Sequence, residues 1–589
     1  MNAHKKNLLR AGLFVLAASS VPSGIAAPAL AADLPPPPLH APAWTWTGLY
    51  FGGSAGAAAG TTTFSDPRGN SVFGDKVNTS AFLAGLQVGY NWQVAPRWLV
   101  GVEADISYLD SNGNFTCMQS SSVIVGSNCE VSPQVLGSLT GRAGLIVDPL
   151  GRTLLYGKGG GAWLNSDILI TPNRDFTNNG TPAGPSAGSH SNAWGGTVGA
   201  GIEHALTPAW SVGLEYDYYR FAATSVSVPA TLNFNGGAGA PVAGNRANVT
   251  PDMQVVKLAL NYHWDQDPRI AWADSPVFGA SVMPLKARPA PALFTGWEVD
   301  AGGRYWYSSG SQKNTSGTGA LTSQLVYGNL TGQSGEFFVR VDTPTRLFVK
   351  GFFGSGGLNG GKDTDEDWGS AAGGAVGGPS GFLVSNGTSS GWFNYAVGDV
   401  GYDVLHERNY KFGPFVGYSY LRQNANAYGC TEVQPTVASC VNAGDNPNRA
   451  TLTEDETWQS LRVGVSAVAT IWDRWGINGD IAYLPYGQYS GLDSHWQRTP
   501  VAFYPQSGTS RGVQAELVLT YLVTDNLELG IGGRYWAMWT AGARQSCHGG
   551  CDPTNSPNQF VTEPAIPYTA NTERFGTFVQ VSYRFPPHF

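Results

Sequence analysis

Alternation of apolar and polar residues is the dominant pattern along this chain. In Val256–Trp264 the even positions are Val, Leu, Leu, Tyr and Trp, and the odd positions are Lys257, Ala259, Asn261 and His263. A period of two places successive side chains on opposite faces, so the pattern predicts β-strands. A soluble β-sandwich has the same period, and the surroundings of these strands must be inferred from other observations.

The composition of the two alternating sets favours strands that cross a membrane. The set that we assign to the inside is polar or small, as at Arg462, Gly464, Ser466, Asn478 and Asp480. The opposite set is apolar and often ends in aromatic residues. An apolar outer face, a polar lumen and aromatic girdles at both interfaces are typical of transmembrane β-barrels.

Connections between the strand-like runs alternate in length. Tight turns include Ala95-Pro96, Thr207-Pro208, Thr343-Pro344 and Thr524-Asp525, and longer segments rich in Gly, Ser and Asn lie between them. Short turns on one side and long loops on the other are the pattern of outer-membrane barrels. The chain also ends in an alternating run closed by aromatic residues, Val579–Phe585.

The runs form two groups, which predict an all-β fold with two tandem antiparallel transmembrane β-barrels. We count about eight runs in residues 44–264 and about ten in residues 294–589, and even numbers are the rule in single-chain bacterial barrels. The long run 321–342 is kept as one strand for that reason. Residues 265–293, rich in Pro and Ala, are predicted to be a periplasmic linker. A single barrel of about eighteen strands is the disfavoured alternative, because it would place this linker in the middle of its sheet.

The N-terminal residues have the pattern of an export signal. Basic residues up to Arg10 precede an apolar run, and Ala29-Leu-Ala31 provides the small residues of a cleavage site. We therefore expect residues 1–31 to be a signal peptide, followed by a Pro-rich lead over residues 32–43. The apolar run is shorter than the roughly 18 residues that a membrane helix requires, and no other stretch reaches that length.

Composition limits the partners of the chain. Only 13% of the residues are charged, and the net charge is −8. A nucleic-acid partner would need a basic stripe, and this balance argues against one. We expect outer-membrane lipid around both barrels, with the long loops extracellular and the linker and termini periplasmic.

Six cysteines form three pairs that are close in the sequence. Their even number, their loop-like surroundings and the export signal favour disulfides formed in an oxidising compartment, with free thiols as the alternative. A zinc site is disfavoured because only His548 lies close to any pair. The pairs, all expected in long loops, are Cys117 with Cys129, Cys430 with Cys440, and Cys547 with Cys551.

Two acidic motifs stand where strand-like runs pass into long connections. Asp365 and Asp367 are two residues apart, and so are Asp493 and His495. Residues i and i+2 of a strand point the same way, and both runs travel outward in our strand count, so the four side chains should face one cleft. Either motif by itself is common on solvated loops. Facing carboxylates raise each other's proton affinity and a carboxylate fixes an imidazole tautomer, so such a set can take a proton from bound water.

The first group of runs resembles the opacity-like eight-stranded outer-membrane surface proteins. The resemblance lies in Trp46-Thr-Gly-Leu-Tyr-Phe-Gly-Gly53 and in the closing run that ends at Tyr262 and Trp264. It covers about the first 220 residues after the predicted signal peptide. In that family the barrel is mainly structural or adhesive, so the resemblance implies no catalytic residue here.

The second group resembles the omptins, which are ten-stranded outer-membrane endopeptidases. The resemblance includes Ser323-Gln-Leu325, Asp365-Glu-Asp367-Trp368 and Tyr489-Ser-Gly491 leading to Asp493-Ser-His495. It implies that Asp493 orients His495, that His495 deprotonates a water, and that the Asp365 and Asp367 pair holds this water and steadies the tetrahedral intermediate. It also implies lipopolysaccharide and a peptide or protein substrate as partners.

Two departures from the omptin pattern concern substrate choice. Omptins that cut between basic residues carry an acid where this chain has Gly491, and another in the first strand, where it reads Arg304-Tyr-Trp-Tyr307. A preference for Arg or Lys therefore does not follow. We find no phosphate-binding loop and no metal-ligand spacing, so we expect no cofactor and no metal.

The sequence-based hypothesis is an outer-membrane protein whose C-terminal barrel is a surface endopeptidase. The alternative is a non-catalytic structural or adhesin-like surface protein. A diffusion pore is disfavoured, because barrels of eight or ten strands are largely filled by side chains, whereas aqueous channels have about sixteen or more. Charged residues at inward positions are expected to pair across the lumen, namely Glu336, Arg340, Lys350, Arg462 and Asp480.

Overall fold

The structure is a computed structural model of the 589-residue chain. It describes residues 45–585 except for residues 70–74, 119–125, 149–150, 174–183, 208, 234–239, 265–295, 319, 369–381, 408–409, 433–449, 473, 497–500, 550 and 552–560. The predicted signal peptide, Pro-rich lead and linker, and Cys440, lie outside these residues. Within them, no helix is long and apolar enough to cross a bilayer.

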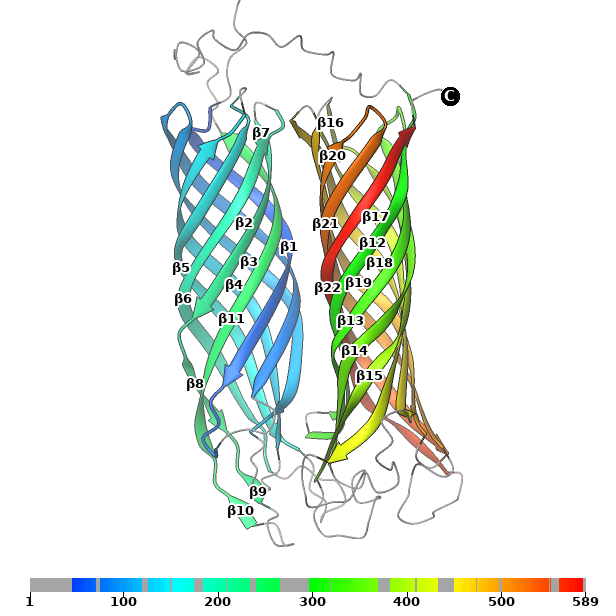
Figure 1. The fold of residues 1–589 in the computed structure, drawn as a ribbon. Coiled ribbons are helices and arrows are strands. Elements are labelled where there is room, and N and C mark those ends of the chain that lie inside the picture. Colours follow the sequence, from blue (N-terminus) through cyan, green and yellow to red (C-terminus); the bar gives the residue numbers. More distant parts are fainter. Residues whose placement is uncertain are drawn as a thin grey trace, which may run out of the picture. The chain divides into compact units, whose positions relative to one another are not determined.

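The first sheet is antiparallel and closes on itself (Figure 1). β8 (Thr224–Val228) follows β7 after two residues and pairs with the same neighbour, so the two segments form one path around the barrel. β1 pairs with both β2 and β11, which closes an eight-membered circuit. Its strands are β1 (Gly48–Phe64), β2 (Lys76–Ala95), β3 (Trp98–Cys117), β4 (Ser127–Ile146), β5 (Thr153–Pro172), β6 (Ala187–Ala205), β7 (Trp210–Phe221) and β11 (Asn245–Trp264), and β9 (Thr231–Asn233) and β10 (Ala240–Val242) form a separate pair.

The second sheet closes in the same way with ten main strands. β12 pairs with β22 and β15 pairs with β17, while the short β16 (Leu405–Glu407) adds to the edge of β17. The predicted two-barrel fold is confirmed, and β13 is a single strand as predicted. The strands are β12 (Glu298–Thr318), β13 (Ala320–Asp342), β14 (Leu347–Trp368), β15 (Phe382–Tyr402), β17 (Tyr410–Glu432), β18 (Ala450–Trp472), β19 (Trp475–His495), β20 (Ala502–Leu522), β21 (Leu527–Gly549) and β22 (Val561–Phe585).

The strands are longer than the alternating runs that predicted them. We call the end with tight turns, such as Trp472 to Trp475, the short-turn end, and the opposite end the long-loop end. On β14 the exposed outward residues Leu347, Val349 and Phe353 are apolar, whereas Ser355 and the outward positions after it are polar or glycine. A membrane-crossing strand needs about 9–11 residues, so the remainder of β14 projects beyond the hydrocarbon at the long-loop end.

This extension corrects two placements made from the sequence. The acidic motifs at Asp365 and Asp493 lie on β14 and β19, and not in loops. Four of the cysteines also lie on strands, namely Cys117, Cys129, Cys430 and Cys547. Alternation of apolar residues ends where the lipid ends, whereas backbone pairing continues into water, so the pattern marks only part of each strand.

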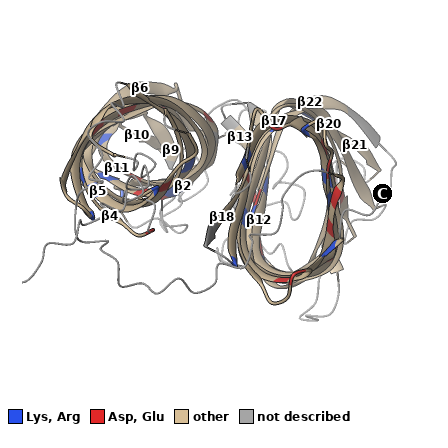
Figure 2. Ribbon diagram, turned by 90° about the horizontal axis from the view of Figure 1, so that it is seen from above, with Lys and Arg blue, Asp and Glu red and all other residues tan. Residues whose placement is uncertain are grey.

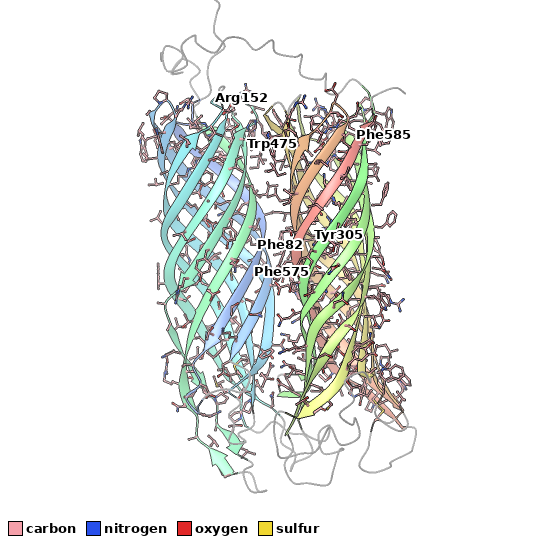
Figure 3. The ribbon with its side chains drawn as sticks, viewed as in Figure 1. Phe82, Arg152, Tyr305, Trp475, Phe575 and Phe585 are labelled. Atoms are coloured by element: carbon pink, nitrogen blue, oxygen red, sulfur yellow. A yellow bond between two sulfur atoms is a disulfide. The ribbon has the colours of Figure 1, made fainter. Side chains whose placement is uncertain are left out.

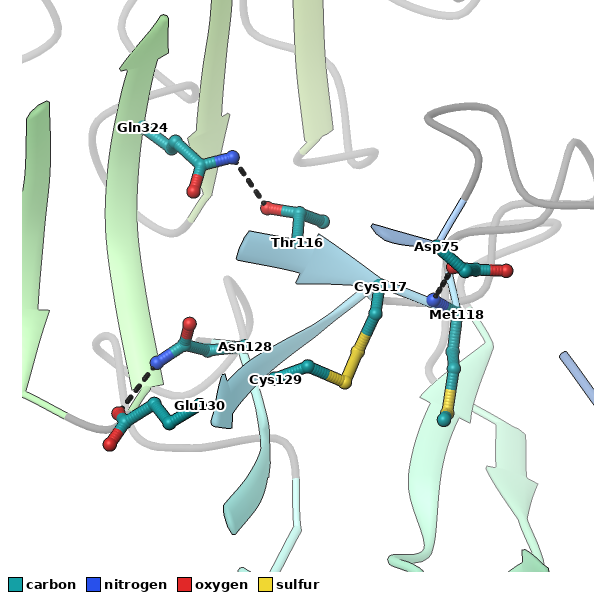
Figure 4. Close-up of a disulfide and its surroundings, with 8 residues drawn as sticks. All are labelled: Asp75, Thr116, Cys117, Met118, Asn128, Cys129, Glu130 and Gln324. Atoms are coloured by element: carbon teal, nitrogen blue, oxygen red, sulfur yellow. Dashed lines mark hydrogen bonds between the residues drawn. A yellow bond between two sulfur atoms is a disulfide. The ribbon is translucent and has the colours of Figure 1, made fainter. Parts of the chain in front are cut away.

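Disulfides tie the long-loop end of both barrels, as predicted. Cys117 is bonded to Cys129, and Cys547 is bonded to Cys551. Cys430 is also disulfide-bonded. Figure 4 shows the first of these bonds beside Met118, whose backbone N–H donates to the Asp75 carboxylate at 2.5 Å.

Side chains fill the lumen of the first barrel in layers. A buried ionic layer centres on Lys158, whose Nζ lies 2.6 Å from Glu215 and 3.1 Å from Glu103, and on Arg142, which lies 3.3 Å from Glu203. Apolar layers follow toward the long-loop end, with residues such as Leu83, Leu109, Leu136, Leu164, Phe221 and Val255, and then Phe64, Val77, Val131, Ile168 and Val249.

The lumen of the second barrel begins with charges and continues with aromatic rings. The predicted pairing of inward charges is confirmed by contacts such as Lys350–Asp480 at 2.5 Å and Arg462–Asp399 at 3.0 Å. The inward set is not polar throughout, because a buried aromatic layer follows the charges. Its rings belong to Trp306, Phe393, Tyr395, Trp536 and Phe578. A ten-stranded barrel of elongated cross-section (Figure 2) is narrow enough for these rings to meet.

Aromatic residues also lie on the outer surface of the second barrel. Tyr305, Phe575 and Phe585 are about half exposed there (Figure 3). Rings at the two edges of an apolar band are the girdles expected of a barrel in a bilayer.

We predict that Arg534→Gln strongly destabilises the second barrel. The guanidinium is fully buried and lies 2.6 Å from both Glu336 and Glu516, so its removal weakens the pairing of two buried carboxylates. The expected loss is about 3–5 kcal/mol in the free energy of unfolding, measured by urea titration of the refolded protein. The matched control is Arg422→Gln, because Arg422 forms an exposed pair with Asp455 and should lose at most about 1 kcal/mol. Equal losses of stability in the two variants would contradict the view that the buried charged layer stabilises the second barrel.

Candidate functional site

The candidate site lies where β19 ends at the long-loop end of the second barrel. Asp493 and His495 are on the same face of β19, and His495 Nε2 lies 2.8 Å from Asp493 Oδ2. Asp493 is 7% exposed, and the His495 ring lies 4.9 Å from the ring of Tyr504 on β20. If the imidazole is neutral, its Nε2–H donates to the carboxylate and Nδ1 keeps a lone pair for accepting a proton.

A β-bulge turns the acids of β14 toward the lumen. The pairing of β14 with β15 shifts by one residue between Leu358 and Gly361, and Gly360 there has φ +70°, a conformation that glycine adopts without strain. Before the bulge the even positions, such as Leu358, face inward. After it the odd positions do, which brings Asp365 and the 7%-exposed Asp367 onto the inner face.

β19 contains a similar β-bulge. Its pairing shifts by one residue between Tyr483 and Gly487 toward β18 and between Leu484 and Gly487 toward β20. The inward set changes from even to odd positions, so Tyr489, Gly491 and Asp493 face the lumen. The sequence motifs alone do not reveal these bulges, although the glycines at both are visible.

The two halves of the candidate site share one end of one lumen. β14 and β19 both run from the short-turn end to the long-loop end and are separated by three main strands around the circuit. Between the halves, the buried Tyr327 hydroxyl of β13 lies within electrostatic reach of Asp365 and Asp493. The predicted site residues thus gather at one mouth, whereas the side chain of Trp368 lies outside the described part of the structure.

Sequence analysis missed two acids below this mouth. Glu454 and Glu456 of β18 are fully buried and stand opposite Asp493 and Gly491 in the strand register. Gln506 Nε2 donates to Glu454 at 3.2 Å, and Trp458 Nε1 donates to Glu456 at 3.2 Å. Their i, i+2 spacing was the available signal, and it is the spacing of the two motifs that were recognised.

The two departures from the omptin pattern have structural reasons. A Cβ at Gly491 would collide with the Gln506 side-chain oxygen and would lie 2.6 Å from the Tyr489 hydroxyl, so a side chain there would have to displace both groups. Arg304 belongs to the charged layer, 3.0 Å from Glu336 and 2.9 Å from Glu516. Its side chain therefore serves the ionic packing of the lumen.

Comparison with known proteins places the first barrel among outer-membrane proteins. Residues 15–264 match the family model of the outer membrane protein beta-barrel domain. The 31 kDa outer-membrane immunogenic protein of Brucella melitensis is 28% identical over 212 residues, which are 34% of this chain and 84% of that protein. The 22 kDa outer membrane protein of Rhizobium leguminosarum bv. viciae is 32% identical over 177 residues, 30% of this chain and 65% of that protein.

A solved structure is similar to half of the chain. The outer membrane protease OmpT from Escherichia coli is 18% identical, with a TM-score of 0.40, over 50% of this chain and 98% of that one.

The family match and the two relatives confirm the predicted resemblance of the first barrel to outer-membrane proteins. Two closed antiparallel sheets with apolar outer bands fit the same setting. The chain is therefore an outer-membrane β-barrel protein.

Proposed function

We propose that the second barrel is a surface endopeptidase that activates water with Asp493, His495, Asp365 and Asp367. The observation that carries the proposal is the 2.8 Å hydrogen bond between Asp493 and His495 at the mouth of a lumen whose other wall presents the two aspartates. A carboxylate, an imidazole and a facing acid pair are sufficient for general base catalysis of peptide hydrolysis.

In the proposed mechanism the Asp493 carboxylate holds His495 in one tautomer. The free Nδ1 takes a proton from a water held between the imidazole and the acid pair, and the resulting hydroxide attacks the scissile carbonyl carbon. Asp365 and Asp367, two residues apart on one strand, share a proton when they face a common site, so one of them can donate to the developing oxyanion. His495 then returns its proton to the leaving amine.

The filled lumen sets the direction of approach. The aromatic layer of Trp306, Tyr395 and Trp536 lies between the charged layer and the candidate site, so a substrate must enter from the long-loop end. We place that end on the cell surface and the linker and termini in the periplasm. Lipopolysaccharide around the second barrel is part of the proposal, because the omptin resemblance implies it.

A structural role is proposed for the first barrel. Its lumen is filled by buried ion pairs such as Lys158–Glu215 and by apolar layers, as expected of side chains that serve packing. A non-catalytic surface protein remains the alternative for the whole chain, and the experiment below distinguishes the two.

We predict that His495→Ala, Asp493→Asn and Asp365→Asn each lower peptide cleavage by at least about 100-fold, because each removes part of the proton-transfer arrangement. The measurement is turnover of a fluorogenic peptide library by the full-length protein in lipopolysaccharide-containing micelles, with folding checked by heat-dependent gel migration. The matched control is His190→Ala, since His190 contacts Asp167 in an exposed pair of the first barrel. Equal turnover by wild type and all variants would contradict the proposed endopeptidase site.

A further inference from the structure

A continuous chain of hydrogen bonds through Glu456, Tyr489, Gln506 and Glu454 lies beneath the candidate site, and we call it the floor of the site. The inward face of β19 descends from His495 through Asp493 and Gly491 to Tyr489, each step about 7 Å along the strand. At Gly491 the strand has no side chain, and the Gln506 amide and Tyr489 hydroxyl occupy the space that a side chain would take. A substrate side chain that descends beside His495 therefore meets these two neutral groups first.

Both acids of the floor are covered by neutral side chains. Gln506 Nε2 lies 3.2 Å from Glu454, and the Tyr489 hydroxyl lies 2.6 Å from Gln506 Oε1 and 3.2 Å from Glu456. Glu454 and Glu456 are 0% exposed, so a substrate reaches neither carboxyl group without displacing Gln506 or Tyr489.

Proton counting indicates that Glu456 is neutral. A tyrosine hydroxyl has one proton, so Tyr489 cannot donate both to Gln506 and to an ionised Glu456. A protonated Glu456 that donates to Tyr489 completes a directed chain through Tyr489 and Gln506 to Glu454. Glu456 lies beyond the hydrocarbon band, which on β18 begins at the exposed Leu461, and burial raises its pKa to about 7.

Among the described residues, the groups that act most strongly on Glu454 and Glu456 include no cation. Burial, with the charges of Asp493 and Glu456, raises the pKa of Glu454 well above its ordinary value. The groups that act most strongly on the two glutamates are neutral or acidic, namely Asp493, Gln506, Asn314, Gln312, Trp458 and Tyr489. Across the lumen Asp363, two residues deeper than Asp365, also has its pKa raised by burial, to about 7.

We infer that this site selects peptides with a small or uncharged hydrogen-bonding side chain beside the scissile bond and rejects Arg and Lys. Gln506 is the specificity-determining residue, because its amide separates the substrate from Glu454. Gln506 and Tyr489 would separate a cation on the floor from Glu454 and Glu456, and burying a charge without a direct partner is costly. This inference rests on the proposed function and names the substrate class of the same site.

The protonation of Glu456 can be tested by a stability measurement that does not depend on peptide cleavage. Glu456 holds a proton in the folded protein and loses it in the unfolded chain above about pH 4.5, so the folded state binds more protons between about pH 4.5 and pH 7. Stability against urea should fall as the pH rises through this range. Glu456→Gln, which mimics the protonated acid, should flatten the fall. An unchanged pH dependence in this variant would contradict the claim that Glu456 is protonated in the folded protein.

Specificity is tested with matched peptides that differ only in the residue beside the scissile bond, using the full-length protein. Wild type should cleave Ala, Ser and Gln peptides with a kcat/KM at least about 10-fold above that for Arg and Lys peptides. Gln506→Glu puts an anion on the floor and Gln506→Ala uncovers Glu454, so both should shift the preference toward Arg and Lys by about 10-fold. The control is Gln459→Glu on the outer face of β18, which should leave it unchanged.

The outcomes separate the two claims. A wild-type preference for Arg or Lys would overturn this inference and leave the endopeptidase standing, and so would an unchanged preference in both folded Gln506 variants. Failure of wild type to cleave any peptide would overturn the proposed function, and the selection of peptides with it.

Discussion

Satisfaction of backbone hydrogen bonds in a hydrocarbon solvent is the constraint on which this structure depends. Lipid offers no partner to an unpaired N–H or C=O, so a sheet that crosses a bilayer must close. The pairing of β1 with β11 and of β15 with β17 provides that closure. Once the circuits are closed, every second side chain points into a narrow lumen, and the lumen must be filled. The ionic and aromatic layers follow from that requirement, because inward charges are stable there only when paired.

Bulges at the edge of the lipid band and beyond it separate the membrane part of the second barrel from its candidate site. Within the apolar band a change of parity would turn polar residues toward lipid, so the register there is fixed. Beyond the band that restriction ends. β14 inserts a residue beyond the band, at Gly360, and β19 inserts one at the edge of the band, between Tyr483 and Gly487, after which they present Asp365 and Asp493 to the interior. The site is therefore built where the strand is free to be irregular.

The same division explains what the sequence could predict. Alternation with an apolar outer set exists because of the lipid, so the two barrels and the number of their main strands could be read from it. The strand ends beyond the lipid lose the apolar outer set and resemble loops in sequence, which is why the acidic motifs and all six cysteines were placed in loops. The motif Asp493-x-His495 could be recognised from its spacing, because i and i+2 remain on one face whichever parity a bulge sets. Glu454 and Glu456 have the same spacing, but only the register of β18 with β19 shows that they lie under the site.

The two kinds of buried acid in this chain differ in how their charge is compensated. Acids in the charged layers face cations, as Glu336 faces Arg534 and Glu215 faces Lys158, and such pairs serve the packing of a lumen. Glu454 and Glu456 have no cation among the groups that act most strongly on them and depend on neutral donors and on protons. Acids that burial keeps neutral add little to the stability of the fold. Buried groups with shifted pKa values and no opposite charge are concentrated at the functional sites of proteins. The contrast between these layers, more than the acidic motifs themselves, is the reason for proposing chemistry at the long-loop end of the second barrel.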